Sequence, residues 1–382
     1  MITIVNEKSP HLRRKDSLAR MLIDVLIALA PTIVFALVVY QWDAARNLAI
    51  SWATMVASEI VYVLIANRIK YDGKKHTFKE HLKSGWSKVT INNVLAPSVS
   101  AAIFALIMPA RTNPYFMIYP ALILGSLFAM IIGKLVFGGT GSNIFNPAAV
   151  GMVFSKICFG SKYIYQSRPF FIVTGGTPLT NSIVEVPGLN SLTGKWMGIN
   201  EVPLESLLFG QVGGTIGEAF KIAILVGMVY LLIRKAADWR IIVSYLSTFV
   251  LLMALAGAII CTRHDINFFR FLAFQLLSGG MLFGVTFMLT DPVTSPINSP
   301  SRFIYGSAAA IITVIIRLFG ALPEGMAYSI LICNMLAPAL DYYKWSSPKW
   351  NKRYVIILCV ALGIALLAVG LGLGFGGEVV AA

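Results

Sequence analysis

The chain has few charged residues for its length. Asp, Glu, Lys and Arg make up 13% of its 382 positions, whereas hydrophobic residues make up 57%. A soluble domain needs more charge than this on its solvated surface, so the composition excludes that class. The mean hydropathy of +0.76 instead indicates a protein whose solvent is lipid.

The sequence also lacks the spacings that bind metal ions. Its four cysteines lie far apart, and no two of them form a Cys-x-x-Cys pair. His76 and His81, two of the four histidines, stand in a lysine-rich loop, where a solvated surface is the better interpretation. We therefore expect no metal site, and any redox centre in this chain must be organic.

Acidic residues are scarce, with 17 Asp and Glu against 31 Lys and Arg. The basic residues cluster just outside apolar runs and form no basic domain, so we expect no nucleic-acid partner. Arg13, Arg14, Lys15 and Arg20 precede the first run and predict a cytoplasmic N-terminus. That run has no small-residue cleavage site, and we interpret it as a retained helix rather than a signal peptide.

Ten or eleven apolar runs predict a polytopic membrane protein. They cover residues 21–40, 47–66, 94–109, 119–137, 146–159, 216–233, 241–261, 268–290, 303–320, 325–340 and 354–376. The loops after the second, sixth and tenth runs are basic, which places them in the cytoplasm and the connection 160–215 outside. Two runs are short, and Ser278-Gly279-Gly280 interrupts a third. Broken helices of this kind build ligand sites near the bilayer midplane.

A weak internal repeat in the sequence predicts that the chain has two related halves. Pro109 and Pro292 end corresponding runs, and Lys134 and Arg317 each follow 25 residues later, before a Phe-Gly pair. Five spans per half require the halves to be inverted. The predicted fold is all-α, with two inverted five-helix repeats. Its segments are a cytoplasmic N-terminus (1–20), a first half (21–159), an external loop (160–215), a second half (216–343) and an extra C-terminal helix (344–382).

Residues Gly138 to Pro147 are polar and glycine-rich between two apolar runs. If they form a helical turn, Asn143 and Asn146 share one face, and their amides suit the edge of a planar heterocycle such as an isoalloxazine ring. The alternative is that both residues cap a half-helix, with Pro147 in its first turn. The residues themselves leave both interpretations open.

Two further segments are candidates for chemistry. Thr174-Gly175-Gly176-Thr177, in the external loop, is either a turn or an exposed backbone on which an enzyme can modify a hydroxyl. Thr290 to Pro296 ends the eighth run with Asp291, which can bind a cation or a polar cofactor edge, or merely cap the helix. Other candidate intramembrane carboxylates are Asp24, Glu59 and Asp341.

In order and spacing, these motifs resemble the RnfD/NqrB family of membrane subunits over residues 9 to 343. The motifs are Ser9-Pro10-His11, Gly138 to Pro147, Ser278-Gly279-Gly280-Met281, Thr290 to Pro296 and Pro323 to Tyr328. The resemblance implies covalent FMN on Thr177, joined through its phosphate, and noncovalent riboflavin near Asn143 and Asn146. Thr174 and Gly176 replace the usual Ser and Ala of the attachment motif, and the usual acidic residue before it is missing.

The resemblance also implies partners and a location. They are the other Rnf complex subunits in the membrane, an external FMN-bearing subunit, cytoplasmic iron–sulfur and NADH-binding subunits, and a flavin transferase. Electron transfer between ferredoxin and NAD⁺ would be coupled to Na⁺ or H⁺ movement across the bacterial inner membrane, with Thr177 outside. The short N-terminus and the D-P-V-T-S-P segment favour this complex over the B subunit of the Na⁺-translocating NADH:quinone oxidoreductase. A non-redox channel, a secondary transporter and a structural scaffold remain rivals.

Overall fold

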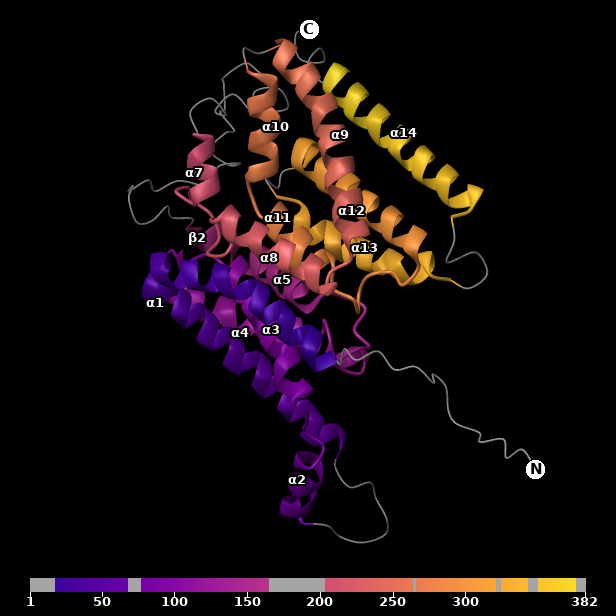
Figure 1. Cartoon of the computed structure of the whole chain (residues 1–382). Helices are drawn as coiled ribbons and strands as arrows, with labels where there is room; N and C mark the ends of the chain where they lie inside the picture. The colour runs from indigo at the N-terminus through magenta and orange to yellow at the C-terminus, as the bar shows by residue number, and fades with distance from the viewer. Residues whose placement is uncertain are drawn as a thin grey trace, which may run out of the picture.

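The computed structural model describes residues 18–67, 77–164, 203–263, 266–320, 324–342 and 350–375 (Figure 1). Thr177 lies outside these residues. The regular elements of the described chain are helices apart from one pair of two-residue strands, which confirms the all-α prediction. The first half contains α1 (Leu18–Ala66), α2 (Phe78–Trp86), α3 (Asn92–Ile107), β1 (Arg111–Thr112), η1 (Tyr115–Met117), α4 (Ile118–Ile131), η2 (Leu135–Phe137), α5 (Pro147–Phe159), η3 (Gly160–Lys162) and β2 (Tyr163–Ile164).

The second half is built in the same way from apolar helices. Its elements are α7 (Leu204–Phe209), α8 (Lys221–Arg234), α9 (Trp239–Arg263), α10 (Phe268–Leu277), α11 (Met281–Gly284), the π-turn η5 (Val285–Leu289), α12 (Ser299–Phe319) and α13 (Met326–Leu340). The appended helix α14 (Lys352–Phe375) lies along the flank of α9 and α12 (Figure 1).

The apolar runs are all helical, but they differ in length. Within the residues that the structure describes, five helical segments are long and apolar enough to cross a membrane, and the bent pair α10 and α11–η5 adds a sixth. The first two predicted spans form one 49-residue segment, α1, whose helical path is broken only at Gln41, where φ is 46°. The remaining apolar helices, α3, α5, α8 and α13, have 13 to 16 residues. They are too short to cross alone, so their ends must be satisfied inside the protein.

The two halves meet through corresponding helices. Within the first half, α3 and α4 pack on α1, and within the second, α12 packs on α9 and α13 (Figure 1). Between the halves, α8 packs on α1 and α13 packs on α5. In the order of the predicted spans, these contacts join the first span to the sixth and the fifth span to the tenth. Two halves of five spans related by a two-fold axis would make contacts of this kind. The inverted repeat stays a prediction that this packing favours.

Glycines bring α4 and α5 into backbone contact. A Cβ on Gly151 would lie 2.8 Å from the carbonyl oxygen of Gly125, and a Cβ on Gly125 would lie 2.2 Å from Ser155 Oγ. Small residues let membrane helices approach closely where lipid provides no hydrophobic drive for their association. This contact seats α5, whose N-terminus contributes to the cavity described below.

A buried polar cluster closes the turn between the two parts of α1. Arg46 donates to the carbonyl oxygen of Ala110 at 2.7 Å, and Arg111 pairs with Asp43 at 2.7 Å. Arg111 belongs to β1, which pairs with β2 in antiparallel fashion. The cluster thus holds the start of the 160–215 connection at the same end of the bundle as the kink in α1.

We predict that Gly151→Val lowers the thermal stability of the chain strongly. Overpacking typically costs about 1–3 kcal/mol, and here the added atoms meet both Gly125 and Ala129. Thermal unfolding in detergent, followed by tryptophan fluorescence, measures the effect. Gly363→Val in α14 is the matched control, because a Cβ there meets nothing within 4 Å. Equal midpoints for the two variants would contradict the close packing of α4 and α5.

Candidate functional site: a cavity between the two halves

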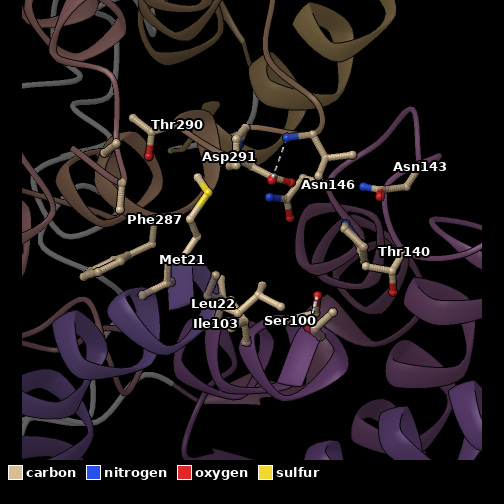
Figure 2. A pocket seen from close by; sticks show the side chains of 18 of the residues that line it. Met21, Leu22, Ser100, Ile103, Thr140, Asn143, Asn146, Phe287, Thr290 and Asp291 are labelled. Carbon is tan, nitrogen blue, oxygen red and sulfur yellow. Dashed lines mark hydrogen bonds between the residues drawn. The ribbon is translucent and has the colours of Figure 1, made fainter. Parts of the chain in front are cut away.

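A cavity lies between α1, α3, the 138–147 segment and the end of η5 (Figure 2). It has about 100 Å³ of space for a water-sized sphere. Asn143, Asn146 and Asp291 all line it, although they come from two segments nearly 150 positions apart. The structure therefore brings together three of the site residues that the sequence singled out.

The cavity has an apolar wall and a polar edge. Met21 and Leu22 of α1, Ile103 of α3 and Phe287 of η5 form the apolar side (Figure 2). Thr140, Asn143, Asn146 and Asp291 supply most of the labelled polar side chains, and Ser100 and Thr290 add hydroxyls beside Ile103 and Phe287. A lining of this kind suits a planar ligand with one apolar face and a hydrogen-bonding edge.

The 138–147 segment is a series of turns and not a helix. Gly138, Gly139 and Gly141 have φ values of 110°, 89° and 94°, a region that residues with a Cβ rarely adopt. The expectation that Asn143 and Asn146 share the face of a helical turn is therefore wrong. Both amides nevertheless reach the same cavity, because the turns fold the segment back over it.

Asn146 caps α5 and connects three elements. Its Oδ1 accepts from the backbone N–H of Ala149 at 3.3 Å, and its Nδ2 donates to the carbonyl oxygen of Met288 in η5 at 3.2 Å. Its backbone N–H donates to Asn334 of α13 at 3.2 Å. The capping interpretation is thus confirmed for Asn146. Asn143 caps nothing, and its Nδ2 donates to the carbonyl oxygen of Phe145 at 3.1 Å.

Asp291 is held by the turn that follows η5. Its Oδ1 accepts from the backbone N–H of Val293 at 3.1 Å, and its Oδ2 accepts from the Thr294 hydroxyl at 3.4 Å. These bonds orient the carboxylate and satisfy part of its hydrogen-bonding capacity. The structure thus shows a structural role for Asp291 in the turn and places its carboxylate at the cavity, and the binding of a cation or a cofactor edge stays a prediction.

Lys134 is a site residue that the sequence patterns did not single out for chemistry. Its side chain is buried, and its Nζ pairs with Glu59 Oε2 at 3.2 Å. The other oxygen of Glu59 accepts from Asn93 at 3.2 Å and from Thr140 at 3.3 Å. Lys134 also lines the cavity and interacts electrostatically with Asp291. The sequence could have indicated a role for Lys134, because an ionisable residue inside an apolar run is a candidate functional residue by default.

Asp24 and Asp341 lie away from this cavity. Asp24 pairs with Arg234 at 3.1 Å and accepts from Tyr230 at 3.1 Å, so it joins α1 to α8. Asp341 accepts from the backbone N–H of Asn298 at 3.2 Å and thereby anchors the start of α12. Both carboxylates have structural partners. In the described part of the chain, no three His, Cys, Asp or Glu side chains gather where a metal ion could bind them.

Comparison with known families shows to which protein family the chain belongs. The family model described as NQR2, RnfD, RnfE matches residues 5–348. The chain belongs to this family. The match covers both halves and every segment that lines the cavity.

Individual relatives within the family are similar along nearly their whole length. The D subunit of the ion-translocating oxidoreductase complex of Alcanivorax borkumensis is 29% identical over 363 residues, covering 90% of this chain and 95% of the relative. The D subunit of the Na⁺-translocating ferredoxin:NAD⁺ oxidoreductase complex of Acetobacterium woodii is 30% identical over 345 residues, covering 90% and 94%. The corresponding protein of Salmonella typhimurium is 27% identical over 368 residues, covering 88% and 95%.

We predict that Lys134→Met destabilises the chain by roughly 3–5 kcal/mol, because it leaves the Glu59 carboxylate buried without its cation. The double variant Glu59→Gln/Lys134→Met should recover most of this loss, since it leaves neither charge unpaired. Chemical unfolding of the single and double variants measures the coupling. Purely additive losses would mean that the two side chains do not act as a pair.

Proposed function

We propose that the chain is the D subunit of an ion-translocating ferredoxin:NAD⁺ oxidoreductase complex in the bacterial inner membrane. The observation that carries the proposal is the convergence of the Gly138–Pro147 and Thr290–Pro296 segments on one amphipathic cavity, in a chain of this family. The names of the relatives support the assignment to an oxidoreductase complex.

In this proposal the cavity binds riboflavin, and Thr177 carries FMN. The residues present fit a flavin ring, because a polar edge faces an apolar wall formed by Met21, Leu22 and Phe287. Thr140, Asn143 and Asp291 would hold the polar edge. Bound riboflavin would supply one-electron and two-electron redox chemistry at this position.

The charged residues around the cavity have defined tasks in the proposal. Added negative charge in a medium of low dielectric constant strongly favours a compensating cation. Lys134 provides one fixed positive charge there, and the Asp291 carboxylate offers oxygen atoms on which a proton or Na⁺ can be held. Asp24 and Asp341 are assigned no part in coupling, because both act as structural links.

Thr177 on the outside and the cavity toward the cytoplasm would make this membrane protein the route by which electrons cross the bilayer. Topology is part of the proposal, and the basic loops after the second, sixth and tenth spans support it. The other Rnf subunits, including the external FMN-bearing and cytoplasmic iron–sulfur and NADH-binding ones, are proposed as partners, and a flavin transferase for maturation.

The two flavin assignments predict that each of two variants loses one flavin and keeps the other. In a chain produced with its partner subunits and the flavin transferase, Thr177→Ala should abolish the FMN mass on the peptide that contains residue 177, while riboflavin extracted by denaturation stays near wild type. Asn143→Leu should lower the extractable riboflavin several-fold and leave the covalent FMN. Asn67→Leu is the matched control, because Asn67 is exposed and remote from the cavity lining.

Mass spectrometry of the peptide and the absorbance spectrum of the denatured extract measure both cofactors. A colourless chain from the complete complex would contradict the proposal and favour a non-redox channel or secondary transporter. Flavin present in wild type, with electron transfer intact in Thr177→Ala, would favour a structural scaffold. Reduction of quinone in place of NAD⁺ would favour the B subunit of the related quinone-reducing complex.

A further inference from the structure

A second group of buried charged residues surrounds the break between α10 and α11, and none of them lines the cavity of Figure 2. The helix ends at Leu277, Gly279 has a φ of 71°, and the two helical parts are bent by 50°. Lys221 Nζ donates to the backbone oxygens of Glu218 and Gly279, both at 2.6 Å. The ammonium thereby satisfies a carbonyl group that the break removes from helical bonding.

Two carboxylates lie against the same break. Glu324, just before α13, accepts a hydrogen bond from the backbone N–H of Gly280 at 2.8 Å. Glu218 packs on this glycine from the other side, because a Cβ on Gly280 would lie 2.1 Å from Glu218 Oε1. The exposed fractions of Glu218, Lys221 and Glu324 are 5%, 2% and 8%. Three ionisable groups thus share a site that is almost closed to bulk solvent.

The site encloses a space for one small occupant. Glu218, Lys221 and Glu324 line a cavity with about 10 Å³ for a water-sized sphere, which is roughly the room that one water molecule needs. A heterocycle cannot enter it. The buried Thr215 side chain lies beside the Glu218 carboxyl and interacts with it. A water molecule in the cavity would give these groups a path for a proton.

The surroundings of the two carboxylates differ. Glu324 accepts a hydrogen bond from the backbone N–H of Gly280 and faces the buried Arg317 of α12. Glu218 faces Lys221, Glu324 and Lys156 of α5.

The Lys221 ammonium donates its hydrogen bonds to carbonyl oxygens. No ion pair within the residues described joins it to a carboxylate. Burial and the neighbouring Glu324 therefore favour the neutral acid at Glu218.

We propose that Glu218 is a proton-binding site of this membrane protein. An O–H bond forms at the carboxylate when the cavity water passes on a proton that it receives from solvent, so that the water molecule itself stays neutral. The same bond breaks when the proton returns along this path. Lys221 keeps its hydrogen bonds to the carbonyl oxygens of Glu218 and Gly279, and Glu324 keeps its bond to the N–H of Gly280. The proposal that Glu218 binds a proton depends only on this geometry. A role of that proton in coupling to electron transfer rests on the proposed function.

Infrared difference spectroscopy of the full-length chain in lipid nanodiscs, with and without deuterium exchange, tests the proposal. The wild type should show the C=O stretch of a protonated carboxylic acid at pH 7, and this band should disappear at alkaline pH. In an Asp291→Asn background, which removes the carboxylate proposed to hold a proton at the other cavity, Glu218→Gln should abolish it. Glu324→Gln should move its titration to lower pH, because it removes a neighbouring negative charge. Asp238→Asn is the control, since Asp238 pairs with Arg302 and Arg240 elsewhere.

Glu218→Asp guards against a variant that fails to fold, because it keeps an acid and should shift the band rather than remove it. A band absent from the wild type at pH 7, or retained in Glu218→Gln combined with Asp291→Asn, would overturn the proposal. The result is distinguishable from a failure of the proposed function. A chain without flavin that shows the band refutes only the flavin assignment, and a flavin-loaded chain without the band refutes only the proton site.

Discussion

Both polar centres depend on one constraint, the need to satisfy backbone and charge where helices break inside an apolar bundle. An unpaired carbonyl or ammonium in such surroundings costs several kcal/mol, so every break must carry its own polar partners. Asn146 supplies them at the start of α5, and Lys221 supplies one at the break between α10 and α11. The groups that repair the backbone are the groups that line the cavities.

This constraint also explains the short helices. α5 and α13 cannot cross a bilayer alone, and each begins beside a buried polar residue, Asn146 for α5 and Glu324 for α13. Their pairing with each other brings Asn334 of α13 to the N-terminus of α5. The interface between the halves is therefore where ligand sites arise, as in transporters built from broken helices.

The two centres correspond to each other. Lys134 and Arg317, which the spacing to Pro109 and Pro292 first linked, are both buried, and both serve an oxygen acceptor on a neighbouring span, Glu59 for Lys134 and the carbonyl of Gln275 for Arg317. Each lies near a glycine-rich break and a buried carboxylate. One centre encloses a cavity suited to a ring and the other has room for a single water molecule. This difference in cavity volume favours different functions for the two related sites.

Much of the fold follows from the sequence by itself. Hydropathy located the apolar helices, and Ser278-Gly279-Gly280 located the break, because both are local properties of the chain. The glycine-rich segment and Asp291 were recognisable for the same reason. Only the tertiary structure decided that Asn143 and Asp291 meet at one cavity, that Asp24 pairs with Arg234 and Asp341 accepts from Asn298, and that Lys134, Glu218 and Lys221 are buried beside carboxylates. Those outcomes depend on contacts between residues far apart in the chain. The local sequence around a charged residue does not determine which distant residue it will pair with.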